Sequence, residues 1–141
     1  MNNEGYIKFN CVWRDSPIEI PTPVFKLLNT WREKLYRHSL IGVYENAVGY
    51  GNISVRNADG TFFITGSATG GKAELEQADY ALVQDWAIEK NELSCYGRTK
   101  ASSESLTHAA IYESYSSVGA VVHVHAESLW KRYFNILPTT S

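Results

Sequence analysis

This 141-residue sequence contains little cysteine, and its two cysteines lie far apart. Cys11 and Cys95 form no CxxC pair, which argues against a disulfide-rich scaffold and against a structural zinc knuckle. Isolated thiols suit a reducing compartment. We therefore expect a cytoplasmic protein.

Long apolar runs and a basic excess are also missing. Nowhere do about 18 apolar residues follow one another, and the N-terminus has no charged segment before an apolar stretch. We therefore expect neither a membrane span nor an export signal. The 13 Lys and Arg residues stand against 15 Asp and Glu residues, giving a net charge of −2. General binding to nucleic acid normally needs a basic excess, so we expect no such partner.

What the sequence does contain is the usual mixture of a globular domain. Hydrophobic residues make up 44% and charged residues 20%, a balance that disordered and fibrous chains do not show. We find no internal repeat and no linker-like tract. The length suits one domain with a real core, and we expect a single domain over residues 1–141.

The spacing of apolar residues predicts mixed α and β structure with hairpins rather than strict βαβ alternation. Alternation over 7–13 predicts a strand, which we regard as an N-terminal extension within residues 1–16. A helix is expected from Val24 to Leu35, with charged residues such as Arg32 between its apolar positions and with Gly42 as its stop. We expect further strands at 53–56, 61–65, 81–83 and 93–96, with turns at 57–60 and 89–92. A second helix should start at Ser102 or Ser103 and end near Ser116. A central strand over 118–125 and a helix over 127–133 should follow.

The sharpest local motif is His123-Val124-His125 at the end of an apolar strand. Residues i and i+2 of a strand project from the same face, so both imidazoles can be directed at one point. Zinc accepts such a pair of ligands. The alternative is one buried, hydrogen-bonded histidine and one at a strand end, and the spacing alone does not decide between them.

Two further motifs are suited to binding an anion. Glu104 follows Ser102 and Ser103 at an expected helix start, where exposed N–H groups and hydroxyls meet. The segments 49–52 and 65–71 are rich in glycine and hydroxyls, and such loops can hold phosphate through backbone N–H groups. The alternatives are a simple capping cluster and ordinary turns, since neither segment matches a P-loop or a GxGxxG fingerprint.

Taken together, these motifs resemble the class II aldolase/adducin superfamily. The family's GNxS element corresponds to 51–54, its strand and Thr/Gly loop to 62–71, its Ser-Ser-Glu to 102–104 and its HxH to 123–125. The resemblance runs from about Val24 to Pro138. It implies a three-layer α/β/α-like domain with a largely antiparallel central sheet, assembled as a homo-oligomer, in this family a tetramer.

The resemblance also implies an activity and a set of roles. The expected function is a metal-dependent aldolase or epimerase that acts on a C–C bond of a phosphorylated sugar or a related hydroxy-carbonyl compound. It implies Zn²⁺ or another divalent metal held by His123 and His125, and Glu104 as the catalytic proton-transfer group. Within this sequence Glu104 is also the best available third metal ligand, since zinc accepts a His₂Glu set. His108, four residues after Glu104, is expected to be a supporting or packing residue. The implied phosphate-binding residues are Asn52, Ser67 or Thr69, Gly70, Ser102 and Ser103.

One part of the family pattern has no counterpart here. The family's third metal-binding histidine and its acid tyrosine come from elements after the point where this sequence stops. The chain could therefore be a fragment, a shortened member, or a catalytically inactive adducin-like binding module. We favour a chain that lacks the C-terminal part, and we expect it alone to be a feeble aldolase or none.

Overall fold

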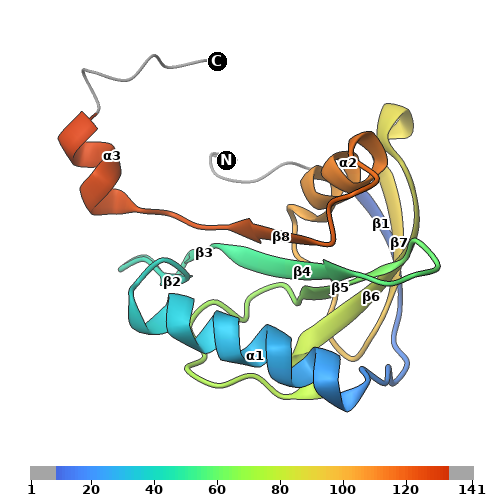
Figure 1. Cartoon of the computed structure of the whole chain (residues 1–141), viewed down its shortest axis with the longest axis horizontal. Coiled ribbons are helices and arrows are strands. Elements are labelled where there is room, and N and C mark those ends of the chain that lie inside the picture. Colours follow the sequence, from blue (N-terminus) through green and yellow to red (C-terminus); the bar gives the residue numbers. More distant parts are fainter. Residues whose placement is uncertain (1–8, 134–141) are drawn as a thin grey trace.

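Six strands form the main sheet of the computed structural model, which describes residues 9–133 (Figure 1). Their order is β1-β7-β6-β5-β4-β8, and every neighbouring pair is antiparallel except β1 with β7. The mixed α/β class and the mostly antiparallel sheet predicted from the sequence are confirmed. The strands are β1 (Asn10–Arg14), β4 (Asn52–Arg56), β5 (Phe62–Thr65), β6 (Tyr80–Ala87), β7 (Glu92–Tyr96) and β8 (Ala120–His123).

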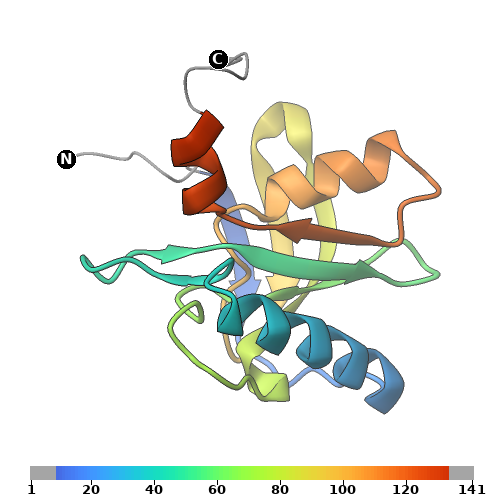
Figure 2. The same cartoon turned by 60° about the vertical axis from the view of Figure 1, so that its left-hand side comes forward.

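Helices cover both faces of this sheet (Figure 2). α1 (Thr22–Arg37) contacts β4, whereas α2 (Ser105–Ser114) contacts β6 and β7 on the opposite face. α3 (Glu127–Tyr133) follows β8 and buries none of its residues. Short 3₁₀ turns lie at Gln77–Asp79 and Ile88–Lys90. α1 starts at a proline-containing first turn, which fits a helix N-terminus, and ends before Ser39, whose φ of 59° is left-handed.

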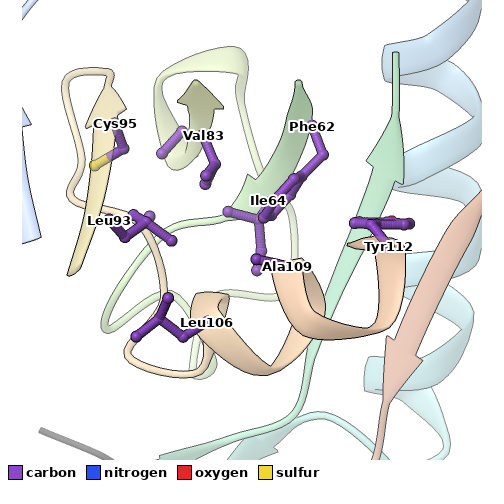
Figure 3. Packing of buried hydrophobic residues seen from close by; sticks show 10 residues of the cluster. Phe62, Ile64, Val83, Leu93, Cys95, Leu106, Ala109 and Tyr112 are labelled. Atoms are coloured by element: carbon purple, nitrogen blue, oxygen red, sulfur yellow. The ribbon is translucent and has the colours of Figure 1, made fainter. Parts of the chain in front are cut away.

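The core is divided between the two faces. The cluster between the sheet and α2 is shown in Figure 3; its labelled members are Phe62, Ile64, Val83, Leu93, Cys95, Leu106, Ala109 and Tyr112. Phe63, between two of these residues on β5, belongs instead to the cluster beneath α1. Successive side chains of a strand point to opposite faces, so β5 is buried on both sides. Its central position explains the continuous apolar run.

A small second sheet pairs β2 (Gly42–Val43) with β3 (Gly49–Tyr50). The sequence alone left 49–52 as a turn or an anion-binding loop, and its first half is instead a strand. Gly51 then adopts a φ of 83°, and a Cβ there would lie 2.7 Å from Cγ1 of Ile41. Glycine is therefore required where this hairpin joins β4.

Several predicted boundaries and positions are wrong. β8 ends at His123 and pairs only with β4 among the described strands, so it is an edge strand rather than a central one. A β-branched run favours a strand but does not say how many neighbours it has. β6 extends to Ala87 because Trp86 and Ala87 continue the ladder with β7. β1 is also an edge strand, and Trp13 is 41% exposed rather than buried. No helix within residues 9–133 is long and apolar enough to cross a membrane.

Candidate functional site

Most of the predicted site residues line one cavity of about 430 Å³. β4 runs antiparallel to both β5 and β8, so the start of β4 lies beside the ends of its two neighbours. The loop after β5, the segment before α2 and the residue just beyond β8 meet at this edge. The predicted residues on the cavity wall are Asn52, Ser67, Gly70, Ser102, Ser103, Glu104 and His125, while Thr69 and His123 are not on it.

The loop over 66–71 contains backbone N–H groups that donate to no acceptor within the described residues. The amides of Gly66 and Ser67 donate to Asp79 and Lys100, but within residues 9–133 the amides of 68–71 donate to no recorded acceptor. Ala68 has a left-handed φ of 62°, a conformation that costs an alanine on the order of 1 kcal/mol. Successive N–H groups beside a left-handed residue form a concavity suited to anions.

The structure distinguishes the two hydroxyls that the sequence left open. The Thr69 side chain is buried, and its Oγ1 donates to the carbonyl of Gly66 over 2.8 Å. Ser67 is exposed and lines the cavity. A hydroxyl already bound to the backbone is poorly placed to contact a ligand, so Ser67 is the better-placed residue.

Gly70 packs too closely against β2 to carry a side chain. A Cβ at this position would lie 2.4 Å from the carbonyl oxygen of Gly42. We expect Gly70→Ala to displace the loop and to lower the free energy of unfolding by about 1–3 kcal/mol. Denaturant unfolding measures this loss. Gly119→Ala is the matched control, because a Cβ there meets nothing within 4 Å. Equal stability of the two variants would contradict this reading of the loop.

A buried chain of hydrogen bonds leads from the core to the cavity. It links Tyr112 Oη to Ser54 Oγ (2.7 Å), Ser54 Oγ to His108 Nδ1 (2.7 Å), His108 Nε2 to Asn52 Oδ1 (2.5 Å) and Asn52 Nδ2 to Glu104 Oε2 (2.7 Å). The carboxylate can only accept, so the amide nitrogen of Asn52 faces it and the amide oxygen accepts from His108 Nε2–H. His108 Nδ1 then accepts the hydroxyl hydrogen of Ser54. The chain therefore fixes one tautomer of His108 and one orientation of Asn52.

His108 is buried and hydrogen-bonded, as predicted for a supporting residue. Burial, aided by the nearby His123, lowers the pKa of His108 from 6.5 to about 4. A lowered histidine pKa means that folding favours the neutral ring, so its stabilising contribution is complete above pH 6.5 and is lost as the pH falls towards 4.

We therefore expect the free energy of unfolding to decrease by about 3 kcal/mol between pH 6.5 and pH 4 through His108. Denaturant unfolding at several pH values measures this dependence. His108→Gln should flatten the profile over that interval, whereas His38→Gln, at an exposed position, should not. A wild-type profile that matches the His108 variant over the interval would contradict the prediction.

Glu104 and the two histidines lie next to one another. Glu104 Oε2 accepts a hydrogen bond from His123 Nδ1–H, and Tyr44 Oη lies 2.6 Å from His125 Nδ1. The two imidazole centroids are 5.0 Å apart, and the Tyr50 ring stacks on His125. Burial opposes ionisation of Glu104, but hydrogen bonds from His123 and Asn52 outweigh it and lower the pKa of the carboxyl. Glu104 is therefore ionised at neutral pH.

The start of α2 differs from the prediction. Ser102 or Ser103 was expected to cap the helix, with Glu104 in its first turn. Instead Glu104 is the N-cap residue, and the cap has no side-chain hydrogen bond. The N–H of Ser105 donates to the carbonyl of Ser102. The Glu104 carboxylate is thus turned away from the helix N–H groups and towards Asn52 and His123.

The predicted metal ligands are neighbours but do not form a ready three-ligand group. Within residues 9–133, no set of three or more His, Cys, Asp or Glu side chains is arranged to hold a metal ion. Each histidine has its Nδ1 atom engaged, by Glu104 for His123 and by Tyr44 for His125. Sequence reasoning missed Tyr44 and Tyr50, because nothing local distinguishes them among nine tyrosines.

Comparisons with solved structures find the same fold in proteins of low sequence identity. YgbL from Klebsiella pneumoniae, named a "putative aldolase/epimerase/decarboxylase", is 20% identical with a TM-score of 0.59, covering 78% of this chain and 47% of that one. An L-fuculose 1-phosphate aldolase is 23% identical with a TM-score of 0.57, covering 77% and 46%. YgbL from Escherichia coli is 20% identical with a TM-score of 0.53, covering 71% and 42%.

The chain therefore spans about half the length of these structures. No curated protein matches it. The family model described as "Class II Aldolase and Adducin N-terminal domain" matches residues 38–130, which contain every predicted site residue. Because this match covers more than half of the sequence, the chain belongs to the class II aldolase and adducin N-terminal domain family.

Proposed function

We propose that this chain supplies the substrate cavity and the proton-transfer group of a metal-dependent aldolase or epimerase. The substrate class is a phosphorylated sugar or a related hydroxy-carbonyl compound. One observation carries the proposal: a single cavity has Ser67, Ala68 and Gly70 of the loop and the pair Ser102 and Ser103 on its wall, together with Glu104 and His125. An anionic end and a reactive end of one small molecule can both be held there. The L-fuculose 1-phosphate aldolase among the structural relatives supports this choice of reaction.

The phosphate end is assigned to the 68–71 amides, the Ser67 hydroxyl and the serine pair. These groups are donors that satisfy phosphate oxygens without a full positive charge. Asn52 donates to Glu104 and also lies 3.3 Å from Ser102 Oγ. Asn52 thus holds the Ser102 hydroxyl and the Glu104 carboxylate at a fixed separation. This separation sets how far the phosphate of the substrate lies from its reacting atoms.

Class II aldolases generally use a divalent metal, and the donor chemistry of His123 and His125 fits one. A metal-binding histidine usually has its other ring nitrogen engaged by a carboxylate or another polar group, which sets its tautomer. Glu104 and Tyr44 engage the two Nδ1 atoms and leave the Nε2 atoms for the metal. When bound, a divalent ion stabilises negative charge that develops on substrate oxygens. A catalytic zinc takes three protein ligands, so we propose that the set is completed from outside the described residues.

Glu104 is assigned the proton transfer. It is ionised, it lies on the cavity wall, and Asn52 and His123 hold its carboxylate in one orientation. A fixed carboxylate can take a proton from a substrate group and return it after the C–C bond has broken. Because His123 already occupies Oε2, we propose that Glu104 orients this histidine and moves protons, rather than serving mainly as a ligand.

We further propose that the protein is a homo-oligomer with a three-layer α/β/α domain. The positions of α1 and α2 on opposite faces support the layers. The incomplete metal group supports assembly, because a neighbouring subunit can contribute side chains at a subunit boundary. Static light scattering tests the assembly, and a monomer at high micromolar concentration would contradict it.

The cavity can be tested with phosphoglycolate, a small phosphorylated acid. Titration followed by NMR should shift the backbone amide signals of 67–71 and 102–104. The turn over 57–60, at the far end of β4, serves as the internal control and should not respond. Absence of a response, or a uniform one, would contradict the phosphate site and would favour a binding module that has lost the enzyme's substrate.

A further inference from the structure

Arg32 lies on α1, before the family match begins, and it is the largest fully buried side chain described. It is 1% exposed, although its place among charged residues of an amphipathic helix predicted a solvated side chain. Burial lowers its pKa, and no carboxylate within residues 9–133 forms a salt bridge with it. A buried cation without an anionic partner is costly, so its contacts need a reason.

The hydrogen bonds of Arg32 are all with the loop that lines the cavity and the residues just after it. Nη2 donates to the carbonyls of Thr69 (2.9 Å) and Gly70 (3.3 Å). Nη1 donates to the carbonyl of Lys72 and, over 3.4 Å, to that of Ala73. The ring of Tyr36 lies 5.0 Å from the guanidinium carbon.

The contacts of Arg32 also determine where the N–H groups of the loop point. In a planar trans peptide the C=O and the following N–H point in opposite directions. The carbonyls of Thr69 and Gly70 point at Arg32, so the N–H groups of Gly70 and Gly71 point away from it. Gly70 is on the cavity wall, whereas Gly71 is not, and within residues 9–133 neither amide donates to a backbone or side-chain acceptor.

We infer that Arg32 is a positioning residue, which aims the Gly70 amide at the anionic end of the substrate. This inference rests on the proposed phosphate site and adds a residue outside the family motif. Arginine suits the task because its planar fork binds several carbonyls at once, whereas lysine offers a single point charge. The guanidinium also polarises the two peptides, which strengthens their N–H groups as donors.

The test compares two arginines that both bind carbonyls. Arg56 donates to the carbonyls of Tyr112, Tyr115 and Ser116 at the end of α2, and it is not on the cavity. Arg32→Lys should weaken phosphoglycolate binding by about 10-fold or more, equivalent to about 1.4 kcal/mol. Arg56→Lys should leave the affinity within about twofold, although both variants lose stability. Unfolding curves separate the loss of affinity from the loss of stability.

A second readout needs no variant. In the wild type, the guanidinium ¹⁵N signals of Arg32 should shift when phosphoglycolate binds, and those of Arg56 should not. Equal affinities for wild type and Arg32→Lys, an equal loss in both variants, or an unresponsive Arg32 signal in a binding wild type would overturn the inference alone. A wild type that binds no phosphoglycolate would overturn the proposed function, and the inference with it.

A separate observation concerns the two cysteines. Cys11 on β1 and Cys95 on β7 have their sulfur atoms 3.5 Å apart, although they are 84 residues apart in sequence. Their shared hydrogen bond lowers the pKa of Cys95 to about 7 and raises that of Cys11. Cys95 is 1% exposed, whereas Cys11 is only partly buried and lies on the edge strand β1. The register pairs Cys11 with Leu93 and Cys95 with Trp13, so the two sulfur atoms meet diagonally across the ladder, and Cys11 is the member that an oxidant can reach.

We propose that Cys11 and Cys95 form a disulfide when the protein meets a low-molecular-weight disulfide such as oxidised glutathione. One cysteine thiolate attacks the glutathione disulfide and releases one glutathione thiol. The other cysteine thiolate then attacks the mixed disulfide and releases the second, so two protein thiols are oxidised and one glutathione disulfide is reduced. The new bond ties the edge strand β1 to β7 and restricts the unfolded chain.

Native protein equilibrated with oxidised glutathione should lose about 2 Da, from two thiol hydrogens, and a digest should yield one Cys11–Cys95 peptide. Its melting temperature should rise, and reduction should reverse the change. Cys11→Ser is the matched control and should show no rise. Two free thiols after equilibration, or only glutathione adducts and intermolecular products, would overturn the proposal.

Discussion

Replacing Glu104 by Gln should lower the rate of retro-aldol cleavage by about 10²–10⁴, the usual effect of removing a positioned acid or base. Gln keeps the shape of the side chain and an oxygen that can accept from His123, but it has no carboxylate to move a proton. The measurement is release of dihydroxyacetone phosphate from several sugar phosphates. The chain spans about half the length of its structural relatives, so the assay should also be made on a form extended by the sequence that follows Ser141 in the source gene, if any follows.

Glu113→Gln provides the control for this prediction. Glu113 is an exposed carboxylate on the same helix, and its recorded contact is with the indole of Trp86, away from the cavity. We expect its variant to keep the wild-type rate. An active form that tolerates Glu104→Gln would contradict the role of Glu104. Full activity of the 141-residue chain alone would contradict our expectation that further elements complete the site.

Local sequence signals predicted the parts of the fold that local interactions determine. The hairpin of β4 and β5 was expected from two β-rich runs around Asn57-Ala58-Asp59-Gly60, and the two strands do pair, with Ser54 opposite Ile64. The place of β8 at the sheet edge was not predictable in this way. Strand order depends on contacts between distant segments, and the apolar run over 118–125 reads the same in a central strand and an edge strand.

For the site, the motifs predicted which residues meet but not the directions of their side chains. Asn52, Ser102 and Glu104 do come together, yet the choice between Ser67 and Thr69 depended on a backbone conformation that only the folded loop reveals. Arg32 escaped notice because a buried arginine and a solvated one have the same helical spacing. Its role depends on loop carbonyls some 40 residues away in sequence, such as that of Lys72.

Replacing both His123 and His125 by Ala should remove most of the divalent metal that the protein retains after loading with zinc and desalting. Imidazole nitrogen is a preferred zinc ligand, and loss of two such ligands leaves only carboxylate and solvent oxygens at the site. Elemental analysis measures the metal content. His38→Ala is the control, because it removes an exposed imidazole that lines a neighbouring cavity with His125 but is not a proposed ligand.

The hydrogen bond of Tyr44 provides a second test of the metal site, because it holds the ring of His125. Tyr44→Phe removes the partner of His125 Nδ1 but no proposed ligand, so it should weaken metal affinity by about 10–100-fold, as loss of an outer hydrogen bond typically does. Tyr36→Phe is a matched control, since its hydroxyl donates to the loop carbonyl of Gly71 and not to a proposed metal ligand within residues 9–133. Equal, near-zero metal in the wild type and in the double His→Ala variant would contradict the metal site. A normal affinity for Tyr44→Phe would instead show that His125 needs no partner to be held in its binding tautomer.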